Sequence, residues 1–237
     1  MKRVIFLSAL ILTIATSVSF AVSQSDVKET RNVSGFTKVS FGVAGNLYIT
    51  FGSEFKVVID GEKRYVEEII TEVSAGKLVI KTDNWKISNW RMNEKVDVYV
   101  TMPELSGLGV SGSGKAQVKD AIKTDNLNLS VSGSGNIHIS GLTVSDLGCS
   151  ISGSGNIDLS GEGIVGKSDI SISGSGNFSG EPVKIETAVI HISGSGNCIC
   201  NVTGSLKASV SGSGNVTYTG NPKIDAHVSG SGKVRSR

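Results

Sequence analysis

The tetrapeptide Ser-Gly-Ser-Gly occurs seven times in this chain of 237 residues, and its spacing constrains the fold more than any other feature. The copies begin at Ser111, Ser132, Ser152, Ser173, Ser193, Ser211 and Ser229, so neighbouring copies are 21, 20, 21, 20, 18 and 18 residues apart. A near-constant period in this range indicates a repeat architecture, in which each unit buries its apolar face against the next.

Apolar and polar residues alternate around each copy. Leu127, Leu129, Val131, Ile137 and Ile139 share one parity, and the other repeats show the same pattern. This period of two predicts extended chain with one buried face. Both glycines of each tetrapeptide fall on the inward parity, where the missing Cβ allows a sharp bend or a positive φ.

Two all-β folds fit this pattern, a β-meander and a parallel β-helix. Antiparallel neighbours in a meander would not place every copy in the same column, whereas a parallel β-helix puts each copy directly above the last. A coil of about 20 extended residues has a contour of roughly 65 Å, which suits three short sides. We therefore predict an all-β parallel β-helix with coils of about 20 residues.

The residue after the tetrapeptide is asparagine in five repeats, at Asn136, Asn156, Asn177, Asn197 and Asn215. In a parallel β-helix these side chains would lie about 4.8 Å apart, close enough for amide-to-amide hydrogen bonds. We expect them to form a structural ladder on the surface. Lys115 and Lys233 take this position in the first and last copies, where we expect them to end the ladder and oppose further stacking.

The first 21 residues have the features of a signal peptide. Lys2 and Arg3 precede an apolar run, and Ser19-Phe20-Ala21 fits a cleavage site. An uncleaved anchor is the alternative, but the run is short and interrupted by Ser and Thr. We predict export to the periplasm, the cell surface or the exterior, with no membrane span in the mature chain and a flexible mature N-terminus at residues 22–31.

Removal of the signal peptide leaves 21 basic and 21 acidic groups, because only Lys2 and Arg3 carry charge within it. A nucleic-acid-binding protein needs a basic face to neutralise phosphates. The sequence therefore predicts no nucleic-acid partner.

Residues 32–104 carry more charged and aromatic side chains than the repeats and read as strands, with a short helical turn between Glu62 and Ile70. Within them Phe41–Ile49 aligns with Val131–Ile139, so that Asn46 matches Asn136. We expect this N-terminal β region to cap the solenoid and to be continuous with the repeats at residues 105–237. An independent first domain is the alternative.

Three features together resemble the putative auto-transporter adhesin head GIN domain family: the opening from Val33 to Ile59, the strand from Val96 to Leu105, and the Ser-Gly-Ser-Gly-Asn coils. The resemblance covers nearly the whole mature chain. It implies a right-handed single-stranded β-helix that is exported to the cell envelope and takes part in adhesion. It carries over no catalytic residue.

The three cysteines, Cys149, Cys198 and Cys200, fall at positions where the alternation places an inward apolar residue. Cys149 and Cys198 would lie two coils apart, about 9.6 Å, which is beyond the reach of a disulfide. We predict buried free thiols that act as small core hydrophobes.

The repeats show no arrangement typical of catalysis or metal binding. His138, His191 and His227 point outward, and only the last two share a column, whereas a zinc site needs three or four converging ligands. The outward positions are mostly Ser, Thr and Asn, without the paired carboxylates of a glycosidase. We therefore expect no catalytic residue, metal or cofactor.

Trp85 and Trp90 are the candidate ligand-binding residues, because two tryptophans in a polar segment can stack on sugar rings. The alternative is that they seal the end of the solenoid. The sequence thus predicts a non-enzymatic β-helix with a structural or adhesive role and cell-surface glycans or proteins as partners. The alternative functions are a carbohydrate-active β-helix enzyme and a self-assembling fibre subunit of the curli type.

Overall fold

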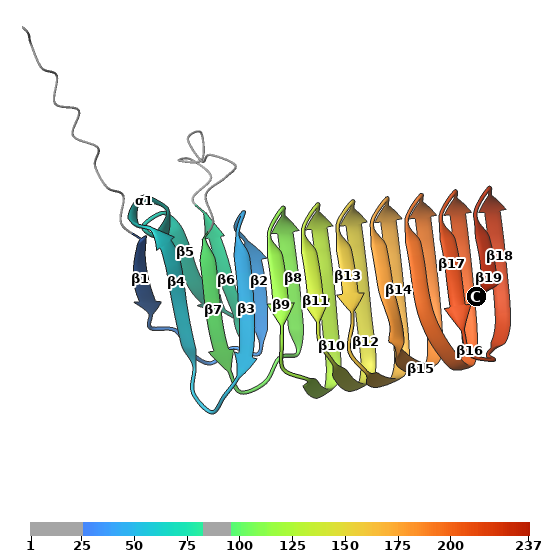
Figure 1. The fold of residues 1–237 in the computed structure, drawn as a ribbon, viewed down its shortest axis with the longest axis horizontal. Helices are drawn as coiled ribbons and strands as arrows, with labels where there is room; N and C mark the ends of the chain where they lie inside the picture. Colours follow the sequence, from blue (N-terminus) through green and yellow to red (C-terminus); the bar gives the residue numbers. More distant parts are fainter. Residues whose placement is uncertain (1–25, 83–95) are drawn as a thin grey trace, which may run out of the picture.

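The computed structural model describes residues 26–82 and 96–237, which form a single elongated β-solenoid (Figure 1). The predicted signal peptide lies outside the described residues, as do Trp85 and Trp90.

Each repeat contributes a long strand, a corner within the Ser-Gly-Ser-Gly unit, and a short strand. The strands of the first repeats are β8 (Gly107–Gly112), β9 (Lys115–Val118), β10 (Ile122–Gly133), β11 (Asn136–Ile139), β12 (Leu142–Gly153), β13 (Asn156–Leu159) and β14 (Gly163–Gly174). Those that follow are β15 (Asn177–Gly194), β16 (Asn197–Gly212), β17 (Asn215–Thr219), β18 (Lys223–Gly230) and β19 (Lys233–Ser236). In β15 and β16 the short strand runs directly into the long one.

Strands of successive repeats pair in parallel and in one register. Ile122 pairs with Leu142 and Leu142 with Gly163, so the coils advance by 20 and 21 residues, the same intervals as the tetrapeptides. Each tetrapeptide therefore stacks on the previous one, as for Ser132 on Ser152. The predicted parallel β-helix with coils of about 20 residues is confirmed.

The N-terminal strands join this stack out of chain order. They are β1 (Asp26–Arg31), β2 (Lys38–Gly42), β3 (Asn46–Phe51), β4 (Lys56–Glu62), β5 (Ile69–Ser74), β6 (Lys77–Thr82) and β7 (Asp97–Met102), with helix α1 (Lys63–Val66). The coil formed by β2 and β3 lies between β6–β7 on one side and β8–β9 on the other (Figure 1). Phe41 pairs with Val110 and Asn46 with Lys115, in the register expected from the alignment with Val131–Ile139.

Antiparallel strands cover the N-terminal edge of the solenoid. β5 pairs with β6, β4 pairs with β7, and β1 in turn pairs with β4. Residues 26–31, which were expected to be part of a flexible N-terminus, are thus an ordered strand. The guanidinium of Arg31 donates a hydrogen bond to the Val66 carbonyl (2.9 Å), and Lys28 pairs with Asp60 (3.0 Å). Charged side chains on an edge strand are a known way of blocking a sheet edge.

The two glycines of each tetrapeptide have different roles. Gly133 and its equivalents form the corner with positive φ, 110° at Gly133, and are partly buried or, in the first and last copies, exposed. The second glycine, Gly135 in the same copy, is buried, and a Cβ there would lie 2.7 Å from the Gly114 carbonyl oxygen. The expectation that both glycines face inward is therefore correct only for the second.

Inward side chains of all coils form one apolar core. Cys149, Cys198 and Cys200 belong to it as free, buried thiols, which confirms that prediction. Burial raises the pKa of the Cys149 thiol, and a hydrogen bond with Cys200 together with burial raises that of Cys198. Both thiols therefore stay protonated at neutral pH and are poor nucleophiles.

We expect a maleimide reagent to label almost no cysteine in the native protein and three after denaturation. The reason is that all three thiols are buried, and the raised pKa values of Cys149 and Cys198 keep those two thiols protonated. Mass spectrometry of the intact protein counts the labels. Rapid native labelling of Cys198 but not Cys200 would contradict the strand parity, because both side chains are fully buried.

Candidate functional site

The short strands form one side of the solenoid, which we call the short-strand face. It comprises β7, β3, β9, β11, β13, the first residues of β15 and β16, β17 and β19. Two columns of outward side chains run along it. The amide column is Asp97, Asn46, Lys115, Asn136, Asn156, Asn177, Asn197, Asn215 and Lys233, and the mixed column begins with Tyr99, Tyr48, Gln117, His138 and Asp158.

The five repeat asparagines are linked by side-chain hydrogen bonds. Each Nδ2 donates to the Oδ1 of the asparagine one coil nearer the N-terminus, over 2.8 Å, 2.9 Å, 3.0 Å and 3.0 Å from Asn156 to Asn215. Every amide therefore has the same orientation. The structure thus brings together all five predicted ladder residues.

The orientation of the amides leaves an interruption at Lys115. Asn46 donates its Nδ2 to Asp97 Oδ1 (2.8 Å), so its Oδ1 is turned toward Lys115. Asn136 accepts from Asn156 through Oδ1, so its Nδ2 is turned toward Lys115 from the other side. Lys115 was expected to end the ladder, but the coil of β2 and β3 continues the column beyond it. Lys115 therefore interrupts the amide column within the stack.

We expect Asn177→Ala to lower the free energy of unfolding by about 1 to 2 kcal/mol, because its side chain takes part in two hydrogen bonds at a half-buried position. Asn215→Ala removes one bond to another asparagine and should cost about half as much. Chemical denaturation of both variants measures the difference. Equal, negligible effects would show that the ladder does not contribute to stability.

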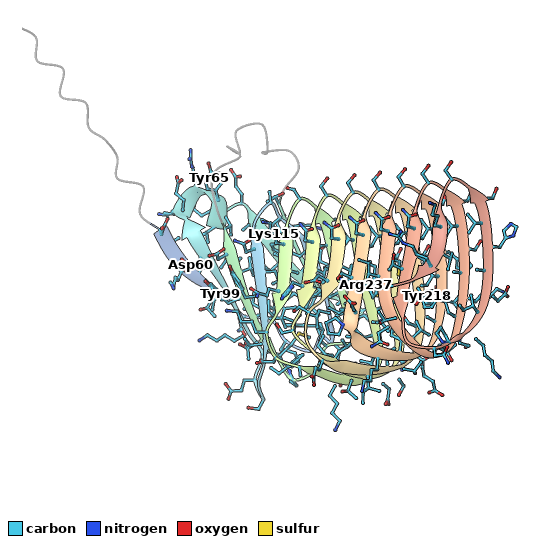
Figure 2. All side chains as sticks on the ribbon, turned by 45° about the vertical axis from the view of Figure 1, so that its right-hand side comes forward. Asp60, Tyr65, Tyr99, Lys115, Tyr218 and Arg237 are labelled. Atoms are coloured by element: carbon cyan, nitrogen blue, oxygen red, sulfur yellow. The ribbon has the colours of Figure 1, made fainter. Side chains whose placement is uncertain are left out.

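Two tyrosines form an aromatic pair at the N-terminal end of the mixed column. The rings of Tyr48 and Tyr99 are stacked, with centroids 5.2 Å apart and planes at 18°. Tyr99 is 41% exposed, and Figure 2 shows it, like Lys115, in the N-terminal half of the solenoid. Partial burial and the charge of Asp97 raise the pKa of the Tyr48 phenol, which therefore remains a neutral hydrogen-bond donor.

A hollow of about 330 Å³ lies over β9, between the aromatic pair and the start of the asparagine ladder. It is lined by Asn46, Leu47, Tyr48, Lys115, Ala116, Gln117, Asn136 and His138. Because Tyr99 covers one face of the Tyr48 ring from β7, the ring turns its other face toward β9 and the hollow. The Lys119 ammonium lies 5.7 Å from the centroid of that ring.

Both ring nitrogens of His138 have hydrogen-bond partners. Nδ1 lies 2.7 Å from Asp158 Oδ2, and Nε2 lies 3.1 Å from Ser160 Oγ. The Ser160 hydroxyl is also 3.4 Å from the Ile139 carbonyl oxygen, to which it can donate its one hydrogen. These contacts hold the imidazole at the edge of the hollow. The side chains of His138 and Asp158 are 38% and 43% exposed.

A second hollow, of about 660 Å³, lies elsewhere on the solenoid, where the pairing of β10 with β12 is interrupted at Asp125 and Ser145. Its walls are Glu104, Ser106, Lys123, Thr124, Asp125, Asn126, Thr143, Val144 and Ser145. Thr143 also lines an adjoining hollow of about 380 Å³. Neither has an aromatic side chain among its described lining residues.

The described residues also bear on metals and membranes. Within residues 26–82 and 96–237, no group of three or more His, Cys, Asp or Glu side chains is placed to hold a metal ion. None of the helical residues in the same ranges forms a segment long and apolar enough to cross a membrane.

The sequence predicts the ladder but not the hollow beside it. The sequence does indicate that two of its lining residues share a column, because the alignment of Phe41–Ile49 with Val131–Ile139 puts Tyr48 at the position of His138. Nothing in the chain order placed Tyr99 beside Tyr48, since β7 stacks on β3 out of sequence.

Comparison with known proteins finds similar solved structures. A putative adhesin from Bacteroides fragilis NCTC 9343 shares 27% identity over 91% of this chain and 98% of its own, with a TM-score of 0.82. Two further structures share the fold. A putative lipid binding protein from Parabacteroides distasonis ATCC 8503 has 21% identity over 91% of this chain and 98% of its own, with a TM-score of 0.73. A putative adhesin from Parabacteroides merdae ATCC 43184 has 23% identity over 91% of this chain and 97% of its own, with a TM-score of 0.71. No curated protein sequence matches significantly.

The family model described as "Putative auto-transporter adhesin, head GIN domain" matches residues 35–222. These residues include β2 to β17, and therefore the whole hollow between Tyr48 and Asn136. The chain belongs to this family of auto-transporter adhesin head GIN domains, which confirms the resemblance drawn from its sequence.

Proposed function

We propose that the mature chain is an exported, non-enzymatic β-helix with an adhesive role at the cell envelope or outside the cell. We propose further that it contacts surface glycans through the short-strand face. Membership of the head GIN domain family supports the adhesive role, as does the similarity to the protein from Bacteroides fragilis described as a putative adhesin, over 98% of that chain.

The observation that carries the glycan proposal is the chemistry of the hollow over β9. The face of the Tyr48 ring opposite Tyr99, which only the exposed Lys119 side chain approaches, is apolar and suits the C–H face of a sugar ring. Beside it, the amides of Asn136 and Gln117 offer donors and acceptors that match sugar hydroxyls. The stacked tyrosines and the ladder hold these groups in place, which reduces the entropy lost on binding.

A glycan array probed with the mature chain, residues 22–237, tests the proposal. We expect binding to a set of surface polysaccharides or oligosaccharides. Tyr48→Ala should weaken it about tenfold or more, the equivalent of one lost aromatic contact. Tyr48→Phe keeps the ring and is the matched control, expected to retain most of the binding.

Two results would contradict the proposal. One is the absence of binding to any glycan by the wild-type chain. The other is equal binding by the wild type and Tyr48→Ala, which would place the contact elsewhere, for example in the hollow beside Asp125.

A hydrolytic function is the second candidate, and the arrangement of Asp158, His138 and Ser160 favours it. A carboxylate on Nδ1 and a hydroxyl near Nε2 is the order of contacts in serine hydrolases. A fluorophosphonate probe tests this candidate: labelling of wild-type protein that disappears in Ser160→Ala would support hydrolysis, and no labelling would exclude the arrangement as a serine nucleophile.

A further inference from the structure

We infer that the hollow over β9 selects a carboxylated sugar, a uronic or sialic acid, by binding its carboxylate between Lys115 and Asn136. This inference rests on the proposed function, since it names the class of glycan that the same hollow would take. It follows from the interruption of the amide column at Lys115.

Asn136 and Lys115 each bring a hydrogen-bond donor to the hollow. In the ladder from Asn156 to Asn215 each Nδ2 has an acceptor on the neighbouring coil, whereas Asn136 is followed toward the N-terminus by Lys115. Among the described residues, no hydrogen bond is donated by Asn136 Nδ2 and no ion pair is formed by Lys115. A neutral and a cationic donor therefore adjoin the hollow together.

Lys115 gives the hollow a positive charge. Lys119 adds another ammonium group, near the Tyr48 ring, and it too has no ion pair in the part of the chain that the structure describes. The nearby carboxylates have partners, since Asp97 accepts from Asn46 and Asp158 contacts His138. Lysines without an ion pair, next to carboxylates that are already held by hydrogen bonds, favour an anionic ligand over a neutral or basic one.

The strand register fixes where a bound sugar would lie. A pyranose ring stacked on the face of Tyr48 opposite Tyr99 lies over β9, because Tyr48 and Gln117 are register partners. A carboxylate on that ring can then accept from both Lys115 Nζ and Asn136 Nδ2, which are side chains of adjacent strands. Charge-assisted hydrogen bonds such as that from the lysine are stronger than those between neutral groups. The amide adds directionality that a lysine alone lacks.

Isothermal titration with matched ligand pairs tests the inference. The pairs are trigalacturonic acid against its methyl-esterified form, and 3′-sialyllactose against lactose, so that the two sources of carboxylate are separated. We expect the wild-type chain to bind at least one carboxylated ligand about tenfold more tightly than its neutral counterpart, a factor typical of one charge-assisted contact. High salt should reduce this preference, because the lysine is exposed.

Lys115→Asn is the decisive variant, since asparagine occupies the same position in six other coils and should fold there. It should lose the preference for the carboxylate while keeping the affinity for the neutral ligand. Its thermal midpoint should be no lower than that of the wild type, because the introduced amide can accept from Asn136 Nδ2 and donate to Asn46 Oδ1. Lys233→Asn, the same change at the other end of the amide column, is the control and should keep the preference.

The failures of the two proposals differ. Equal affinity of the wild type for both members of each pair, or an intact preference in Lys115→Asn, would overturn the inference and leave glycan binding standing. No binding to any of the four ligands, together with a blank glycan array, would overturn both.

Discussion

Gly155→Val is expected to lower the free energy of unfolding by more than about 3 kcal/mol, which places it among the largest effects of a single substitution. A Cβ at this position would lie 2.2 Å from the Gly135 carbonyl oxygen and 2.4 Å from Val131 Cγ1. Neither can move freely, because Gly135 is backbone in the previous coil and Val131 is part of the core. The coils would have to separate.

Circular dichroism during heating measures the effect, which should be a fall of roughly 6–12 °C in the unfolding midpoint for a domain of this size. Ser152→Val is the matched control, because Ser152 is in the same repeat with an exposed side chain. It should change stability by no more than about 0.5 kcal/mol. A fall of only a few degrees in the unfolding midpoint of Gly155→Val would mean that the second glycine of each tetrapeptide is not where the coils make their close contact.

Phe178→Ala should cost about 3–5 kcal/mol, the usual range for a buried phenylalanine. Phe178 is 1% exposed and lies between Ile157 and Cys198 of the adjacent coils. Alanine would leave a cavity that rigid neighbouring strands cannot close.

Gly180 provides the control for this prediction. A Cβ on Gly180 would lie 2.8 Å from Phe178 Cε1, so the large ring fits only because a glycine follows it on the inward side. The preceding coil has Ile157 and Leu159 in the matching positions. Gly180→Leu alone should therefore destabilise, and the double change Phe178→Ile with Gly180→Leu should recover most of the loss. Additive costs in the double variant would contradict this account of core filling.

Much of the fold follows from the sequence because the repeats carry consistent signals. The period of the tetrapeptides set the coil length, and the parity of residues such as Leu129 and Val131 identified the core. The place of β6 and β7 beyond β2 and β3 could not be predicted, since stacking order in a parallel sheet depends on contacts between strands of similar pattern. Asp97-Val98-Tyr99-Val100 and Asn46-Leu47-Tyr48-Ile49 have nearly the same pattern of side chains.

The candidate site was only partly predictable for a related reason. Alignment of the repeats was enough to place the asparagines in one column. Alignment does not give the orientation of each side-chain amide, because this depends on which neighbour donates the hydrogen bond and which accepts it. That direction makes Lys115 an interruption with a donor on one side and an acceptor on the other. The pair of Tyr48 and Tyr99 likewise needs the three-dimensional order of the coils.

Hydrogen–deuterium exchange of the mature chain, with and without the strongest-binding glycan from the array, is the most direct test that the short-strand face is the binding surface. We predict slower exchange in peptides that contain β3, β7, β9 and β11, around residues 46–51, 97–102, 115–118 and 136–139. Exchange near Lys123 and Thr143, in the second hollow, should not change. Protection confined to the second hollow, or protection nowhere on the solenoid, would contradict the account.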